Sequence, residues 1–273
     1  MFGSTKFALL ATAVAGLQLA GTSAQSISSQ CQSTLASILT SSDASCLNAQ
    51  SLLGLAAASG NTSVVPTINT WLTGLCAKPA CTNQTISALV QNVTSGCQSE
   101  LSSLGLSGID ASELTALVES AYPTVRKVAC LSDTKQNNEL CVTEFLTGVE
   151  GTTGNLSVAN IEALVTNFGT SGSLPNLSSN VTCSNCVKAA YTIVSTDFAG
   201  ILPSSVGSYF QNTCGASFTN GSSPSDVTES ASSATSSTTV TSNGALPAVG
   251  FAPVVGIAAS ILVAASSALV VLA

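Results

Sequence analysis

The sequence predicts an all-α domain, a disulfide-rich bundle of short helices followed by a disordered Ser/Thr-rich stalk and an apolar C-terminal helix. Ten cysteines fall in the central part of the 273 residues, and apolar side chains recur there at the three-and-four spacing of helical faces. Alternating strand patterns bounded by hairpin turns are missing. We therefore expect fewer than about a tenth of the residues in strands, below the average for globular proteins.

Residues 1–24 are typical of a secretory signal peptide. Lys6 supplies the positive start, Phe7 to Ala20 carry no charge, and Thr22 to Ala24 offer small residues for cleavage before Gln25. An N-terminal membrane anchor is the alternative, but the apolar run falls short of the ~20 residues that span a bilayer.

The next segment, residues 25–221, contains all ten cysteines and is the predicted ectodomain. An even count in a secreted chain implies up to five disulfides, each contributing about 2–4 kcal/mol by restricting the unfolded state. The gap between Cys183 and Cys186 also occurs in zinc and redox sites, but its only possible partners are other cysteines, which an oxidising compartment would bridge, so we expect neither a metal nor a cofactor. The ten are Cys31, Cys46, Cys76, Cys81, Cys97, Cys130, Cys141, Cys183, Cys186 and Cys214.

Several helices can be placed from their apolar faces and their end signals. Asn83 or Thr85 is the expected cap of the first, Asp110 begins a capping box with Glu113, and Pro123 should end that second helix or start the next. Gly169 closes a later helix and Pro203 opens the last. The apolar faces are Ile86, Leu89, Val90, Val93 and Cys97; Leu114, Leu117 and Val118; Val125, Val128 and Cys130; Ile161, Leu164, Val165 and Phe168; Val187, Ala190, Tyr191 and Val194; and Val206, Phe210 and Cys214.

The order of the cysteine spacings suggests a degenerate duplication with halves 25–105 and 106–221. In each half the successive spacings run short, long, very short and medium, although no residue identity supports the repeat. Each half holds five cysteines, and an odd group cannot be paired wholly within itself. If all ten are bridged, at least one disulfide must therefore cross a division drawn between Ser102 and Gly108.

Seven Asn-x-Ser/Thr sequons lie in the ectodomain, where the secretory route permits N-glycosylation. With only 7% of residues charged, sugar would keep this surface soluble. The sequon residues are Asn61, Asn83, Asn92, Asn155, Asn176, Asn180 and Asn220.

Residues 222–243 form the predicted stalk, and 244–273 form a propeptide for glycosylphosphatidylinositol (GPI) attachment or a membrane segment. Ser and Thr make up 14 of the 21 residues from Ser222 to Ser242. The segment therefore has too few apolar side chains for their burial to offset the entropy lost on ordering. Val254 to Ala273 is an apolar run long enough to span a bilayer, and no basic residue follows it. Small residues upstream make Asn243, or else Ser242, the expected attachment site. A retained transmembrane helix is the alternative.

The composition excludes several functions. Without histidine there is no Ser-His-Asp or Cys-His catalytic unit, and six basic residues cannot form a nucleic-acid-binding stripe. The Arg126–Lys127 pair should be an exposed helix face, and Trp71 a mostly buried core residue. We expect no enzyme, because the scattered carboxylates should be solvated residues or helix caps and aromatic rings are too sparse for a glycosidase cleft. These carboxylates are Glu100, Asp110, Glu113, Glu119, Glu139, Glu144, Glu150 and Glu162.

Three strings, at residues 71–76, 121–130 and 183–191, resemble a family of basidiomycete fungal secreted proteins with a cysteine-rich domain of unknown function, a Ser/Thr stalk and an apolar tail. The resemblance implies a fungal cell-surface location and transfers no functional residue.

Two functions follow as hypotheses. The first is a non-enzymatic surface or cell-wall glycoprotein with a structural or adhesive role, attached to the outer leaflet of the plasma membrane and in contact with cell-wall polysaccharide. The second is a saposin-like or elicitin-like binding module for a lipid, sterol or other apolar ligand. An enclosed apolar cavity of several hundred Å³ would favour the second.

Overall fold

The computed structural model describes residues 28–56, 61–103, 106, 110–157, 160–161, 177–199, 202 and 204–232. Most of them are helical and the three strands hold eight residues in total, which confirms the predicted all-α class. The helices are α2 (Ser29–Thr40), α3 (Leu53–Ala56), α4 (Val65–Ala77), α5 (Asn83–Gly96), α6 (Gln98–Ser103), α7 (Ala111–Ala129), α8 (Cys141–Thr153), α10 (Ser179–Thr182), α11 (Asn185–Asp197) and α12 (Ser204–Cys214).

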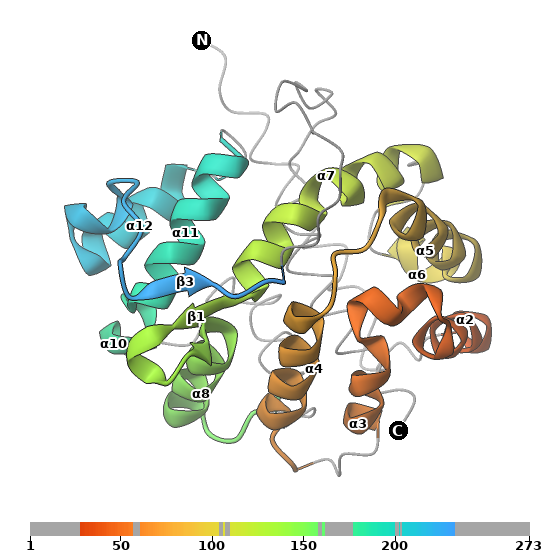
Figure 1. Cartoon of the computed structure of the whole chain (residues 1–273), viewed down its shortest axis with the longest axis horizontal. Coiled ribbons are helices and arrows are strands. Elements are labelled where there is room, and N and C mark those ends of the chain that lie inside the picture. Colours follow the sequence, from red (N-terminus) through yellow and green to blue (C-terminus); the bar gives the residue numbers. More distant parts are fainter. Residues whose placement is uncertain are drawn as a thin grey trace.

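Helix α7 runs through the middle of the molecule (Figure 1). It packs against α5 on one side and against α11 on the other. Short 3-10 segments complete the connections, among them η2 (Asp43–Leu47), η3 (Ala49–Leu52), η4 (Thr134–Gln136) and η5 (Ala216–Thr219).

Helix α5 has the predicted apolar face, since Ile86, Leu89 and Val90 are all buried. The predicted cap, Asn83 or Thr85, was wrong. Thr82 has an extended backbone and its hydroxyl accepts a hydrogen bond from Thr85 N at 3.2 Å, so Thr82 is the cap.

Helices α2 and α5 lie close together because Gly96 has no side chain. A Cβ atom at Gly96 would lie 2.0 Å from Oγ1 of Thr34, a distance that real structures do not show. The Cys31–Cys97 disulfide holds the same contact, with 4.5 Å between the two Cα atoms.

The predicted break at Pro123 was wrong, because α7 continues through it to Ala129. The predicted cap at Asp110 is confirmed, since its carboxylate accepts from Ser112 N at 3.4 Å. Pro123 lacks an N–H and removes one helical hydrogen bond. Tertiary contacts hold the helix beyond it: Thr124 is buried and its hydroxyl donates to Asp197 at 2.8 Å.

Helix α11 is confirmed, but its most buried residues are one position from the predicted face. Cys186, Ala189 and Thr192 are buried, whereas Val187 and Ala190 are half-buried. The Cys141–Cys186 disulfide turns this side of α11 toward α8 and the sheet. Of the helix predicted from Ile161 to Phe168, only Ile161 lies within the described residues. The last predicted helix is α12, whose described part begins at Ser204; Pro203 itself lies outside the described residues.

A small antiparallel sheet connects the end of α7 to the C-terminal part of the fold. Its strands are β1 (Leu131–Asp133), β2 (Glu139–Leu140) and β3 (Val227–Glu229), in the order β2-β1-β3. In register, Ser132 lies opposite Leu140 on one side and opposite Thr228 on the other.

The predicted start of the stalk at Ser222 was wrong, because residues 226–232, here called the C-terminal strap, belong to the fold. Thr134 N donates to Asp226 O at 2.8 Å, Ser230 N to Cys130 O at 2.8 Å, and Ser232 N to Cys76 O at 2.7 Å. Backbone pairing does not depend on side-chain hydrophobicity, so a Ser-rich segment can still complete an open strand edge. The rest of the predicted stalk, 233–243, lies outside the described residues.

The core consists of clusters formed between the helices. One cluster, around Leu72, Leu75 and Leu140, includes both cysteines of the Cys76–Cys130 disulfide, and Cys130 is 0% exposed. Ala231 of the strap packs against this cluster, and Val227 packs against a second one around Leu131 and Cys186. The strap therefore covers two parts of the core.

Candidate functional site

The disulfide framework is the clearest functional feature, and it uses all ten predicted cysteines. No cysteine is free. Five closed bridges are typical of an extracellular protein, because the cytosol keeps thiols reduced. The pairs are Cys31–Cys97, Cys46–Cys81, Cys76–Cys130, Cys141–Cys186 and Cys183–Cys214.

One of these bridges, Cys76–Cys130, crosses the division between Ser102 and Gly108, as the count of cysteines requires. It joins the end of α4 to the end of α7. The remaining bridges close within one half or the other. The two halves are therefore covalently one unit.

The pairing does not repeat between the predicted halves. In both halves the second cysteine pairs with the fourth. The fifth, however, pairs with the first in the N-terminal half and with the third in the C-terminal half. The disulfides thus do not follow the suggested duplication.

Arg126 was wrongly predicted to lie on an exposed face. It is 6% exposed, and its guanidinium donates to Leu75 O at 3.0 Å and also to Lys78 O. These carbonyls lie at the C-terminal end of α4, where a cation is stabilised by the helix dipole. Lys127 does remain accessible, and it pairs with Asp197 at 3.3 Å.

Trp71 is half-buried, less than predicted, and it packs against the Leu72–Cys130 cluster. Its indole N–H donates to Leu47 O at 2.8 Å. In the same turn of α4, Trp71 O accepts from the Asn48 side chain at 3.0 Å. These bonds join α4 to the 3-10 segments before it.

Four carboxylates meet beside the small sheet, three from one short stretch of the chain and the fourth from the distant strap. Asp133 ends β1, Glu139 begins β2, Glu144 lies in the first turn of α8, and Asp226 begins the strap. Sequence reasoning took Glu139 and Glu144 as separate surface residues and placed Asp226 in the stalk. No local signal predicts this cluster, since the sheet and the strap bring its members together.

The two best-defined carboxylates in the cluster have opposite environments. The Lys135 ammonium, 3.0 Å away, and the Asn185 amide, 2.7 Å away, hold the pKa of Asp226 below its usual value. Burial raises the pKa of Glu144, and the charges of Asp133, Glu139 and Asp226 raise it further. Such opposed shifts occur in catalytic carboxylate pairs. Here the Asp226 carboxylate already has two protein partners and is largely buried, so it serves to hold the strap.

The cluster offers little to a metal ion. Atoms of Asp133, Glu144 and Cys186 lie within 4.8 Å of one another. The sulfur of Cys186, however, is bonded to Cys141 and is not a thiolate. Two carboxylates remain, and one of them, Asp133, accepts a bond from Lys135 N at 2.7 Å.

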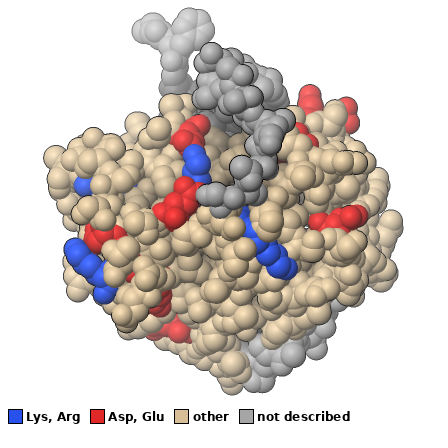
Figure 2. Space-filling view, viewed as in Figure 1, with Lys and Arg blue, Asp and Glu red and all other residues tan. Residues whose placement is uncertain are grey.

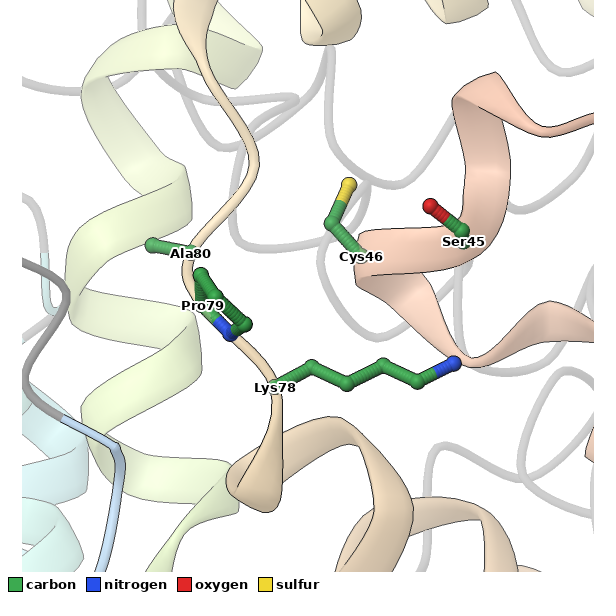
Figure 3. A pocket seen from close by; sticks show the side chains of 5 residues that line it. All are labelled: Ser45, Cys46, Lys78, Pro79 and Ala80. Carbon is green, nitrogen blue, oxygen red and sulfur yellow. The ribbon is translucent and has the colours of Figure 1, made fainter.

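A surface pocket of about 370 Å³ lies between η2 and the loop that joins α4 to α5. Its lining residues are Ser45, Cys46, Lys78, Pro79 and Ala80 (Figure 3). The Lys78 side chain extends from the end of α4 toward η2, on the opposite side of the pocket (Figure 3). The pocket is open to solvent and has a cation at its edge, unlike an enclosed apolar cavity.

Six of the seven sequon asparagines lie among the described residues, and all six are exposed. Each could therefore carry a glycan without displacing the core. Asn176 lies outside the described residues, as do the signal peptide 1–24, the attachment residues Asn243 and Ser242, and the apolar segment 244–273. Within the described part of the chain, no helix is both long enough and apolar enough to cross a membrane.

Comparison with protein families, with curated proteins and with solved structures finds no match to this chain.

Proposed function

We propose that this chain is a non-enzymatic cell-surface or cell-wall glycoprotein with a structural or adhesive role. The observation that carries the proposal is the closed disulfide framework, in which Cys76–Cys130 joins both halves of an extracellular domain. A domain braced in this way resists unfolding and proteolysis outside the cell. Such stability is expected of a protein that functions through its surface and not through a reaction centre.

The character of the surface supports the same proposal. Charged side chains are few and scattered over the face shown in Figure 2. The six described sequon residues are exposed on several different elements, so glycans would cover much of the surface. A glycan-covered surface with few charges and a net negative balance, -7 for the whole chain, is compatible with a location among uncharged wall polysaccharides and disfavours anionic partners.

The ligand-carrier alternative has less support. A carrier of a lipid or sterol needs an enclosed, apolar space, whereas the pocket beside Lys78 is open and borders on a charged side chain. In the Leu72–Cys130 cluster, the apolar side chains of the helices pack against one another and form part of the core.

Attachment to the cell surface rests on the sequence alone, namely on the small residues near Asn243, on the apolar segment that follows, and on the resemblance to fungal surface proteins. A phosphatidylinositol-specific phospholipase should release the protein from intact cells into the medium. A protein that stays with the cells and still contains residues 244–273 by mass spectrometry would contradict lipid anchoring and favour a transmembrane tail.

One experiment separates the structural role from the carrier. The protein is purified without detergent from the culture supernatant of a eukaryotic host that secretes residues 1–243, and it is extracted with organic solvent for lipid mass spectrometry. We expect no lipid in stoichiometric amount. One lipid or sterol per protein molecule would overturn the proposal. Cells that display the intact chain should also adhere to one another or to wall material more strongly than cells that display an unrelated glycoprotein.

A further inference from the structure

The C-terminal strap and the residues that lead to it lie outside every disulfide loop, because Cys214 is the last cysteine of the chain. The segment from Gly215 to Ser232 has 18 residues and can leave the fold without breaking a disulfide. At the other end of the domain, Cys31 comes only three positions after Ser28, the first described residue. The two ends therefore differ in how much chain they can release.

Between Cys31 and Cys214 the disulfides shorten the covalent path. Along the backbone these two cysteines are 183 residues apart. The shortest route through the bridges uses four stretches of 15, 5, 11 and 3 residues, and tension between the ends can extend no more than these. The stretches are 31–46, 76–81, 130–141 and 183–186, joined by Cys46–Cys81, Cys76–Cys130, Cys141–Cys186 and Cys183–Cys214.

The strap crosses from the side of α12 to the end of α7 (Figure 1) and is held mainly by backbone hydrogen bonds. Ser232 N donates to Cys76 O at 2.7 Å, and Ser230 N donates to Cys130 O at 2.8 Å. Before them, Val227–Glu229 pairs with β1. Of the seven strap residues four are exposed and only one is buried, so the strap covers little apolar surface with its own side chains.

Tension that enters from the stalk reaches the contacts of the strap in a fixed order. Ser232 is the first strap residue on that side, and Asp226 is the last. The Asp226 carboxylate is held by two side chains, since it accepts from the Lys135 ammonium at 3.0 Å and from the Asn185 amide at 2.7 Å. A ladder that is opened from one end loses its hydrogen bonds one after another, so we expect the strap to yield before any helix that is packed into the core.

A second contact holds the chain in front of the strap. Phe218, in η5, is 4% exposed, and its ring centroid lies 4.9 Å from that of Phe210 and 6.2 Å from that of Tyr191. The Gln211 amide also donates to the Thr219 hydroxyl at 2.9 Å. The η5 segment should therefore stay in place after the strap has come away.

We propose that the strap is a tether that tension releases in two steps. Pulling from the C-terminal side first frees residues 220–232 and then residues 215–219, and the Cys183–Cys214 disulfide stops further release. Fully extended, the 18 residues from 215 to 232 span about 60 Å. The disulfide-bonded remainder keeps its fold, so the strap can return to its partners on β1 when the tension falls.

This inference deepens the proposed function and rests on it in one respect. A tether is useful only if the chain is held at the cell surface through its C-terminal side. An adhesive contact on the ectodomain and an anchor beyond the stalk would then place the strap under tension between them. The added length lets the ectodomain follow a moving partner before the adhesive contact breaks.

Single-molecule force spectroscopy tests the order of release. The secreted protein that ends at residue 243 is held by one handle before Gln25 and another after residue 243, without reductant. We expect two early, reversible steps of up to about 45 Å for residues 220–232 and up to about 17 Å for residues 215–219, and then a stop. A first step longer than about 60 Å, or no step before the disulfides are reduced, would overturn the inference.

Variants of two contacts assign the steps. Asp226→Ala removes the contacts with Lys135 and Asn185 and should lower the force of the first step, whereas Glu229→Ala is the matched control, since Glu229 is an exposed residue of the same strand. Phe218→Ala should merge the two steps and leave their total length unchanged. Equal forces for the first step in Asp226→Ala and Glu229→Ala would exclude the strap as the segment that yields first.

A third variant tests the stop. Replacing Cys183 and Cys214 together with alanine moves the stop to Cys186, which is bridged to Cys141. The releasable segment then grows to the 46 residues of 187–232, so early extension should continue beyond 60 Å toward about 160 Å. An unchanged early extension would show that this bridge is not the stop and would overturn the inference.

Replacing Cys46 and Cys81 with alanine is the matched control, because that bridge lies in the N-terminal half and should leave both early steps as they are. All these measurements are made on purified protein. A failure of the two-step release would leave the proposed surface role standing, and a failure of phospholipase release or of adhesion would leave the two-step release standing.

Discussion

Replacement of Arg126 with methionine should destabilise the ectodomain strongly, although sequence alone places this residue on the surface. Methionine keeps an unbranched apolar stem in the site and removes every donor. Lys78 O then loses its guanidinium partner, and Leu75 O loses one of two, because it also accepts from Lys78 N at 3.3 Å. Hydrogen bonds to charged groups are worth about 1.5–3 kcal/mol each, so the loss should be at least about 3 kcal/mol.

Urea unfolding of the secreted ectodomain, followed by Trp71 fluorescence and by circular dichroism, measures this loss. Lys127→Met is the matched control, since Lys127 is 44% exposed and its ion pair with Asp197 should contribute no more than about 1 kcal/mol. Arg126→Lys should fall between the two, because lysine restores the charge but not the forked geometry. If Arg126→Met and Lys127→Met lose equal amounts, the buried role of Arg126 is refuted.

Three further predictions concern the disulfide, the strap and pH. Replacing Cys76 and Cys130 together with alanine opens a loop of 54 residues and should cost about 4 kcal/mol, seen in calorimetry as one transition at lower Tm because the core clusters contain residues of both halves; an unchanged Tm would contradict it. A chain that ends at Gly221 should be less stable and more sensitive to protease than one that ends at Ser232, and equal protease half-lives would show that the strap is dispensable. Because burial raises the pKa of Glu144, its protonated form is favoured in the fold, so wild-type stability should fall as pH rises from about 4.5 through the raised pKa; Glu144→Gln should remove this fall, and identical pH profiles would exclude it.

Local features of the fold could be predicted from the sequence. The apolar spacing of Ile86, Leu89 and Val90 predicts the buried face of α5, because a helix places these positions on one side whatever it packs against. The Asp110 cap follows in the same way from short-range chemistry. Counting cysteines was enough to require a bridge between the halves, but not to identify Cys76 and Cys130 as its ends.

Features set by distant contacts could not be predicted. The partners of Arg126 lie 51 and 48 residues earlier in the chain, and nothing near Arg126 distinguishes it from Lys127. Pro123 normally ends a helix, and only the packing of α7 between α5 and α11 explains why this one continues. The strap is the clearest case: its Ser-rich sequence predicts a stalk, whereas the open edge of β1 makes it a strand.

The acidic cluster beside the sheet and the contact between the Tyr191 and Phe218 rings were missed for the same reason. Glu144 and Asp226 are 82 residues apart and meet only because the strap returns to β1. Tyr191 and Phe218 meet only after Cys183 and Cys214 are joined. Scattered polar and aromatic residues therefore carry no signal until the disulfides and the sheet are placed.

The central claim is that the chain forms one extracellular domain whose two halves are joined through Cys76 and Cys130. Digestion of the secreted protein with pepsin, without reduction and at acid pH, where scarce thiolates prevent disulfide exchange, tests it by mass spectrometry of the peptides. We predict a linked pair of peptides that contains Cys76 and Cys130, which separates on reduction, and no thiol that reacts with an alkylating reagent beforehand. Cys76 and Cys130 that are alkylated when the unreduced protein is denatured in the presence of the reagent would contradict the claim.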